Sequence, residues 1–102
     1  MVTSEISVRE LAALGPDAHV IDVREHYEWD GGHISTAVHV PMASVPDHLE
    51  LFVERTTYVI CHSGGRSLRV CEYVAGHGHE VVNVAGGMMA WAAAGYDVVL
   101  GS

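Results

Sequence analysis

The sequence contains no lysine, and its five arginines face thirteen acidic residues, for a formal net charge of −8. Proteins that bind nucleic acid neutralise phosphates with clustered basic side chains. Here the one close pair of basic residues is Arg66 and Arg69. We therefore expect no nucleic-acid partner. The acidity also implies that an anionic substrate must be attracted by local groups, because the overall field of the protein repels it.

Long apolar runs are missing as well. No stretch approaches the ~20 consecutive apolar residues that span a bilayer, and residues 1–5 lack the basic start and apolar run of a secretory signal. These absences favour a cytoplasmic protein with no membrane partner. The 102 residues are 49% hydrophobic and 18% charged, which suits a compact core. We expect residues 1–102 to form one domain and the protein to be a monomer.

Cysteine is scarce, and the spacings typical of metal sites are missing. The chain has two cysteines and eight histidines, without the paired spacing that zinc sites use. We therefore expect neither a metal nor another cofactor. Cys71 lies three residues from both Leu68 and Val74, on the face that a helix would bury, which favours packing as its role.

The centre of the chain, residues 55–76, predicts a strand, a loop and a helix. Residues 57–60 are β-branched and aromatic, as buried strands are. From Leu68 onward apolar residues recur at helical spacing, and Gly76 can end the helix. The loop between them begins with Cys61 and contains two glycines. Because loop amides and the positive end of a helix stabilise a thiolate, this pattern indicates a nucleophile at Cys61.

Strands and helices alternate along the rest of the chain, which predicts an α/β fold with a mostly parallel sheet and helices on both faces. The spacing of Ser7 and Glu10 predicts a capping box at the start of a helix. The apolar residues 20–23 predict a strand that ends beside Asp22 and Arg24, at the edge where open α/β sheets place ligands. By themselves, these two residues predict an ion pair that pins the loops. We further expect a short helix at 26–30 with Tyr27 and Trp29 inside, strands at 37–40, 80–84 and 96–100, and a helix after Gly87 with Met88 and Trp91 in the core.

Four motifs, in this order, closely resemble the single-domain rhodaneses: Asp22-Val-Arg24-Glu25, Gly32-His33-Ile34, Cys61-His62-Ser63-Gly64-Gly65-Arg66-Ser67, and Gly86-Gly87-Met88 with Trp91. The resemblance runs from about residue 6 to residue 100. It implies the rhodanese fold with about five strands, and a sulfurtransferase that carries sulfur as a persulfide on Cys61. It also implies that Asp22, Arg24 and His33 support the site without doing chemistry. The family commonly continues the second motif with Pro-Gly-Ala, and the Ser35-Thr36-Ala37 found here affects only the local turn.

The loop after Cys61 is expected to bind the substrate, through His62, Ser63, Gly64, Gly65, Arg66 and Ser67. Its amides would hydrogen-bond first the thiolate and then the persulfide, like an oxyanion hole. Gly64 and Gly65 allow positive φ and a close approach of the backbone. Arg66 either holds the loop or attracts the sulfite end of a donor. Ser67 is expected to cap the helix, and His62 to lie at the mouth of the pocket.

Two other functions share this architecture. Tyrosine-type and dual-specificity phosphatases use Cys-x5-Arg, a loop wide enough for a tetrahedral phosphate and a bidentate arginine. From Cys61 to Arg66 the spacing is Cys-x4-Arg, one residue shorter, which favours sulfur. The second alternative is a non-catalytic or carrier module that binds a protein partner or delivers sulfur to it. The presence of Cys61 in an intact loop favours catalysis.

The substrates are predicted only by class. The expected donor is thiosulfate or a related persulfide, and the expected acceptor is cyanide, a thiol or a protein. His62 and Ser63 place no fixed positive charge early in the loop. We therefore expect thiosulfate turnover to be modest.

Overall fold

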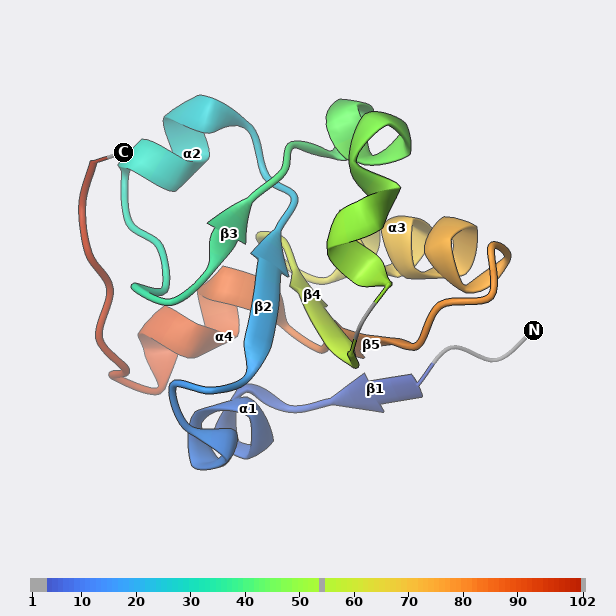
Figure 1. Cartoon of the computed structure of the whole chain (residues 1–102). Helices are drawn as coiled ribbons and strands as arrows, with labels where there is room; N and C mark the ends of the chain where they lie inside the picture. Colours follow the sequence, from blue (N-terminus) through green and yellow to red (C-terminus); the bar gives the residue numbers. More distant parts are fainter. Residues whose placement is uncertain (1–3, 54, 102) are drawn as a thin grey trace.

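A five-stranded sheet forms the centre of the protein (Figure 1), in a computed structural model that describes residues 4–53 and 55–101. The strands are β1 (Ser4–Ile6), β2 (His19–Asp22), β3 (Val38–His39), β4 (Thr57–Ile60) and β5 (Val81–Val84). Their order is β1-β5-β4-β2-β3, and every neighbouring pair is parallel. The helices are α1 (Val8–Leu14), α2 (His26–Asp30), the 3₁₀ helix η1 (Met42–Phe52), α3 (Gly65–Ala75) and α4 (Gly87–Ala93). The predicted α/β class and parallel sheet are confirmed.

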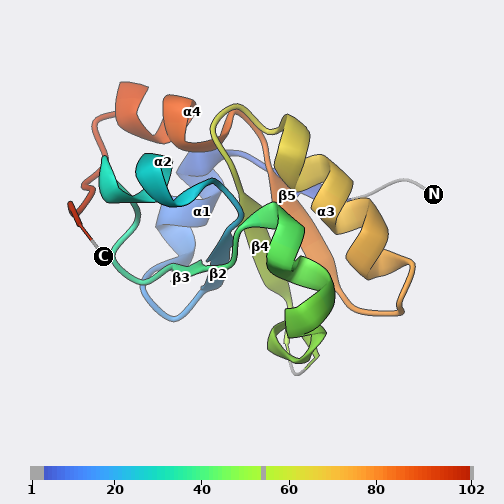
Figure 2. The same ribbon diagram turned by 90° about the horizontal axis from the view of Figure 1, so that it is seen from above.

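Helices cover both faces of the sheet, with α3 and η1 on one side and α1 and α4 on the other (Figure 2). Successive strand residues point to opposite faces. Ile21 and Val59 therefore pack with Val70 of α3, whereas Val20 and Ile60 belong to the core beneath α1 and α4. Because β2 and β4 are buried on both faces, their sequences are continuous apolar runs rather than alternating ones.

The predicted capping box starts α1. The Ser7 hydroxyl accepts a hydrogen bond from the Glu10 N–H at 3.1 Å, and the Ser7 N–H donates to Glu10 Oε1 at 3.0 Å. These two bonds satisfy backbone donors that a helix start leaves without partners. The short connection from β1 into α1 is thereby fixed by local sequence.

Two predictions, a strand at residues 96–100 and a buried Tyr27, are wrong. Residues 96–100 form no strand of the sheet; Val99 makes an isolated antiparallel bridge with His33, with hydrogen bonds of 2.8 and 2.9 Å. The apolar run therefore lies across the turn that contains His33 rather than extending the sheet. Tyr27 is 77% exposed, whereas Trp29 is buried, because the single turn of α2 presents only one side to the core.

Within the described residues, no helix combines the length and the apolar character needed to cross a membrane.

Candidate active site

Cys61 follows β4, the middle strand, at the carboxyl edge of the sheet. From β2 the chain moves outward to β3, and from β4 it moves in the opposite direction to β5. The gap between β2 and β4 is therefore the point where strand order reverses, and open α/β sheets bind ligands at such points. Asp22 pairs in register with Ile60, so the end of β2 lies beside the loop that Cys61 begins.

Hydrogen-bond donors surround the sulfur of Cys61. The Gly64 N–H donates to Sγ at 3.1 Å, and the Ser67 hydroxyl lies 3.3 Å from Sγ. Burial raises the pKa of the thiol, but hydrogen bonds from the Ser67 hydroxyl and from the N–H groups of Ser67, Gly64 and Ser63 outweigh burial and lower the pKa below its usual 9.0. Cys61 is only 1% exposed, yet these donors point toward its sulfur. The loop therefore stabilises a thiolate.

The start of α4 holds the same loop from behind. The N–H groups of Met88 and Met89 donate to the carbonyl oxygens of Cys61 at 2.8 Å and of His62 at 2.9 Å. Gly87 has a φ of +55°, and a Cβ at this position would overlap the carbonyl groups of Cys61 and His62. Only glycine lets α4 come this close to the loop. The double glycine before Met88 is the sequence signal for this contact.

The charge of Arg66 is paired inside the protein. Its Nη1 and Nη2 atoms donate to the two carboxylate oxygens of Glu28 at 2.7 and 2.8 Å. The hydrogen bond from Arg66 is the main cause that lowers the pKa of Glu28 from 4.5 to about 2. Of the two roles expected for Arg66, this geometry supports holding the loop. Glu28 is not among the predicted site residues, because its contact with Arg66 spans 38 positions of sequence.

Arg24 fastens the helix that carries Glu28. The expected ion pair with Asp22 is present at 2.8 Å, and both side chains are almost fully buried. Arg24 also donates to the carbonyl oxygens of Glu28 at 3.2 Å and of Gly32 at 2.8 Å. Asp22 and Arg24 thus connect the end of β2 to α2 and to the following turn, without contacting the sulfur through any hydrogen bond found in the described residues.

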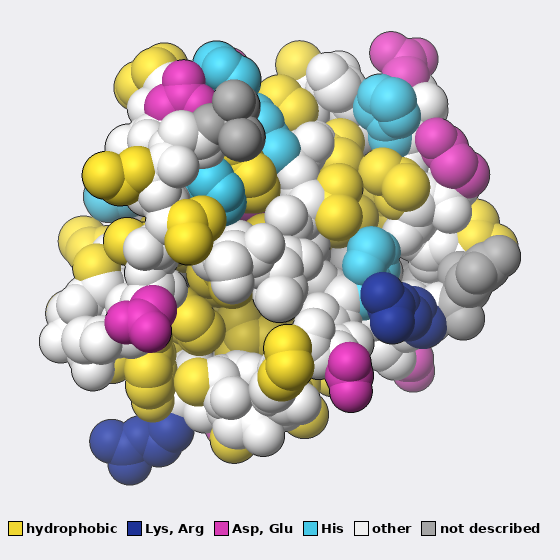
Figure 3. Space-filling view, turned by 60° about the vertical axis from the view of Figure 1, so that its left-hand side comes forward, with side chains coloured by type: hydrophobic (Ala, Val, Ile, Leu, Met, Phe, Trp, Pro, Cys, Tyr) yellow, Lys and Arg dark blue, Asp and Glu magenta, His cyan; other side chains and the backbone are white. Residues whose placement is uncertain are grey.

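Aromatic stacking fixes the other side of α2. The Trp29 ring lies between His33, at a centroid distance of 3.5 Å, and His39, at 4.7 Å. His33 Nδ1 also hydrogen-bonds the Trp29 carbonyl oxygen at 2.9 Å, which is a structural role. Histidine side chains gather at the upper left of the face in Figure 3, at the height that α2 has in Figure 1. This stack keeps α2 in the place from which Glu28 reaches the loop.

The helix after the loop starts earlier than predicted. Gly64, with a φ of +108°, precedes the first helical residue of α3, so Gly64 and not Ser67 is the cap. Ser67 lies inside the helix and is fully buried, with its hydroxyl turned toward Cys61 and Asn83. Gly65 does not need its expected positive φ, because it belongs to the first turn of α3. The sequence analysis assigned no role to Asn83.

Comparison with known proteins shows the family of the chain. Residues 7–94 match the family model of the rhodanese-like domain. The chain belongs to the rhodanese-like domain family. The protein named "Putative sulfurtransferase YtwF" of Bacillus subtilis (strain 168) is 42% identical over 89 residues, which cover 86% of either chain. The "Thiosulfate sulfurtransferase GlpE" of Pseudomonas entomophila (strain L48) is 31% identical over 83 residues, covering 79% of this chain and 76% of that protein.

A solved rhodanese-related structure extends the comparison to the fold. The crystal structure of a rhodanese-related protein from Thermoplasma volcanium aligns with a TM-score of 0.89 at 30% identity, over 95% of this chain and 98% of that one. The family resemblance carried by the four sequence motifs is therefore confirmed, together with the five-stranded rhodanese-like fold.

A cavity of about 350 Å³ lies beside the rhodanese-like loop. Its lining includes Arg24, His62, Met88 and Val98. His62 is exposed and reaches this cavity, as expected for a residue at the mouth, whereas Cys61 does not line it. The cavity therefore lies next to the loop, whereas the sulfur of Cys61 is buried behind its wall.

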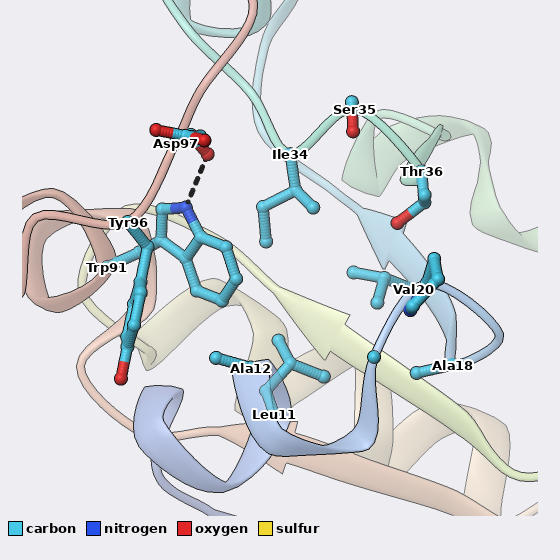
Figure 4. Close-up of a pocket in the computed structure, with 12 residues that line it drawn as sticks. Leu11, Ala12, Ala18, Val20, Ile34, Ser35, Thr36, Trp91, Tyr96 and Asp97 are labelled. Atoms are coloured by element: carbon cyan, nitrogen blue, oxygen red, sulfur yellow. Dashed lines mark hydrogen bonds between the residues drawn. The ribbon is translucent and has the colours of Figure 1, made fainter.

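Another hollow, of about 310 Å³, is lined by residues of α1, β2 and α4 (Figure 4). Leu11, Ile34, Trp91 and Tyr96 form much of its wall, and the Trp91 ring N–H donates to the Asp97 carbonyl oxygen at 2.9 Å. Its described lining includes none of residues 61–67. Because no residue of the Cys61 loop lines it, this hollow is a weaker candidate for the functional site than the cavity beside the loop.

Cys71 is as buried as Cys61, but its thiol pKa is shifted in the opposite direction. It is fully buried on α3, and burial raises the pKa of its thiol to about 12. Among residues 4–53 and 55–101, no three side chains of His, Cys, Asp or Glu come together as metal ligands. Of the two cysteine thiols, only that of Cys61 has its pKa lowered by its surroundings.

Proposed function

We propose that this protein is a sulfurtransferase that holds the transferred sulfur as a persulfide on Cys61. The observation that carries the proposal is the sulfur of Cys61, which accepts hydrogen bonds from Gly64 and Ser67 at the carboxyl edge of the sheet. The thiolate is the nucleophilic form of cysteine, and its activation is the requirement for covalent group transfer. Membership in the rhodanese-like family, with a relative named as a sulfurtransferase, supports the same chemistry.

In the first half-reaction, the Cys61 thiolate attacks the outer sulfur of thiosulfate or of a related persulfide donor. A new S–S bond forms to Sγ, and the old bond of the donor breaks with its electron pair on the leaving sulfite or thiolate. The negative charge on Sγ moves to the terminal sulfur of the persulfide. The N–H groups of residues 63, 64 and 67 are already oriented for an anion, so they need little rearrangement as the charge moves.

In the second half-reaction, a thiophilic acceptor takes the terminal sulfur. Cyanide, a thiol or a protein thiolate attacks that sulfur, and the electron pair of the breaking S–S bond returns to Sγ of Cys61. The thiolate is regenerated, so no oxidant, reductant, metal or organic cofactor is consumed.

The paired arginines bear on the choice of donor. Arg66 is held by Glu28 and Arg24 by Asp22, so neither offers an uncompensated charge to a dianion such as thiosulfate. The net charge of −8 also opposes its approach. We propose that thiosulfate is turned over slowly, and that a persulfide donor with a smaller total negative charge is the better donor.

A carrier module is the alternative function, and the burial of Cys61 favours it. With Cys61 only 1% exposed, a persulfide on Sγ would be sheltered from small thiols in solution. A protein partner that opens the loop could then receive the sulfur directly. Such a carrier would form the persulfide but discharge it slowly to cyanide.

Mass spectrometry after incubation with thiosulfate or glutathione persulfide tests the proposal. The Cys61 peptide is expected to gain about 32 Da, the mass of one sulfur atom, and cyanide is expected to remove it. Cys61→Ser should gain nothing, whereas Cys71→Ala should behave as the wild type. If the folded wild type gains no sulfur from either donor, the enzymatic function is refuted. A persulfide that forms but resists cyanide and thiols would favour the carrier.

A further inference from the structure

The Ser67 hydroxyl has one proton and three acceptors within reach. From Ser67 Oγ, the distances are 3.3 Å to Cys61 Sγ, 3.1 Å to the Gly64 carbonyl oxygen and 2.5 Å to Asn83 Oδ1. Ser67 is fully buried and Asn83 is 2% exposed, so protein groups must satisfy this hydroxyl. A single hydroxyl proton serves one acceptor well. When one of the three acceptors receives this proton, the other two receive no hydrogen bond from Ser67.

The contacts of the Asn83 amide nitrogen determine which atom of the amide faces Ser67. Asn83 Nδ2 lies 3.2 Å from Glu5 Oε2 and 3.4 Å from the Gly64 carbonyl oxygen. Both of these oxygens accept hydrogen bonds, so the amide NH₂ faces them. The carbonyl oxygen of Asn83 must then face Ser67, as an acceptor. Glu5, on the edge strand β1, thereby fixes the orientation of an amide in the middle of the molecule.

We propose that Asn83 is a positioning residue that competes with Cys61 Sγ for the Ser67 proton. Both distances, 2.5 Å to Asn83 Oδ1 and 3.3 Å to Sγ, allow a hydrogen bond, so the proton is divided between the two acceptors and Sγ receives the Ser67 hydrogen bond only part of the time. Asn83 acts only through Ser67 and contacts neither the sulfur nor a substrate. The inference rests on the proposed function to the extent that the sulfur concerned is the one that carries the persulfide.

The competition matters because Cys61 has opposite tasks in the two half-reactions. It is the attacking group in the first and the leaving group in the second. A less stabilised thiolate is a stronger nucleophile, whereas a thiol of lower pKa leaves faster. By drawing one hydrogen bond away from Sγ, Asn83 shifts the balance toward attack on the donor. Asn83 takes no part in the ion pair of Asp22 with Arg24 or in that of Glu28 with Arg66, so both pairs should persist when Asn83 is replaced.

Alkylation of Cys61 by iodoacetamide as a function of pH tests the inference in Asn83→Leu. Leucine has nearly the shape of asparagine but offers no acceptor, so the Ser67 proton becomes available to Sγ. With Cys71→Ala as the common background, we expect the midpoint of the profile to move to lower pH. The plateau rate should fall by about twofold, because a better stabilised thiolate is less nucleophilic. An unchanged or higher midpoint in folded Asn83→Leu would overturn the inference.

The same substitution in Ser67→Ala is the matched control. Without the hydroxyl there is no proton to compete for, so Asn83→Leu should leave the midpoint where Ser67→Ala puts it. A further movement there would show that Asn83 acts by another route, and would also overturn the inference. Circular dichroism of each variant establishes that the compared proteins are folded.

Glu5→Gln tests the same chain of contacts from the surface, without changing the core. The glutamine amide can donate as well as accept, so Asn83 is free to turn its NH₂ toward Ser67, and the midpoint should again move to lower pH. When Glu5→Gln is combined with Asn83→Leu, it should cause no further shift of the midpoint. If the shift persists, Glu5 acts directly through its charge, and its role in orienting Asn83 is refuted. Alkylation needs no sulfur donor, so these results stand apart from success or failure in forming the persulfide.

Discussion

The guanidinium of Arg66 and the carboxylate of Glu28 meet in two parallel hydrogen bonds of 2.7 and 2.8 Å, across 38 positions of sequence. The ion pair joins the first turn of α3 to α2, and so ties the loop of Cys61 to the end of β2. Because Glu28 compensates its charge, Arg66 is a fixed brace of the loop rather than a mobile cation.

The acid stability of the protein should report this ion pair. The folded-state pKa of Glu28, about 2, lies below its usual 4.5, so the pair stabilises the fold fully above pH 4.5 and is lost as the pH falls toward 2. Over this range, the free energy of unfolding of the wild type should fall by about 1–2 kcal/mol more than that of Glu28→Gln, a figure reduced for screening because Arg66 is one-third exposed. Urea denaturation at several pH values measures the difference. Glu72 is exposed, so the control variant Glu72→Gln should lose as much stability in acid as the wild type does. Equal acid sensitivity of the wild type and Glu28→Gln would contradict the prediction.

Replacing Gly87 by alanine should disrupt the active-site loop. A Cβ there overlaps the carbonyl groups of Cys61 and His62, and the φ of +55° is itself unfavourable for alanine. We expect a loss of about 2–4 kcal/mol of stability, together with slower persulfide formation. Gly95→Ala is the matched control, because Gly95 has a φ of +82° but open space around its Cβ position. It should cost about 1–2 kcal/mol, from strain alone, and leave sulfur transfer intact. Equal effects of the two substitutions would show that the close approach of α4 is unimportant.

The two cysteines should differ sharply in reactivity. Hydrogen bonds lower the pKa of Cys61 despite its burial, whereas burial raises that of Cys71 to about 12. Near neutral pH, iodoacetamide should therefore modify the Cys61 peptide of the folded protein and leave the Cys71 peptide unmodified. Cys61→Ser should take up reagent only after denaturant is added. Peptide mass spectrometry measures both sites, and equal labelling of the two thiols in the native state would contradict the assigned roles.

Local sequence predicted the strand, loop and helix around Cys61, but not the distant residues that orient this loop. The strand before Cys61 and the glycines after it follow from patterns within a few residues of each other, as does the capping box of α1. Ser67 was misassigned as a helix cap because serine is favoured there, whereas in the fold its hydroxyl is turned toward Sγ and Gly64 takes the cap position. Glu28 reaches the site only because α2 packs beside the loop. Such a contact depends on how the helices and loops pack in three dimensions, and no local sequence pattern indicates it.

The segment at residues 96–100 shows a related limit. Its apolar, β-branched composition is typical of a strand, yet β-propensity expresses fit to a half-buried surface rather than membership in a given sheet. Here the surface is the turn around His33, and only Val99 forms a bridge to it. The sheet has the five strands that the family resemblance implies, with β1 at the edge beside β5.

Phosphate analogues should distinguish this loop from that of a phosphatase. A tetrahedral oxyanion needs a wide loop and a free, bidentate arginine, whereas the spacing here is Cys-x4-Arg and Arg66 already holds Glu28. We expect orthovanadate neither to slow persulfide formation nor to protect Cys61 from alkylation. Glu28→Gln separates the two causes, because it releases the guanidinium while the loop keeps its length. If Glu28→Gln remains insensitive to orthovanadate, the length of the loop is sufficient to exclude phosphate; if it becomes sensitive, the ion pair with Glu28 is what reserves the site for sulfur. Protection of the wild type by orthovanadate would contradict both explanations.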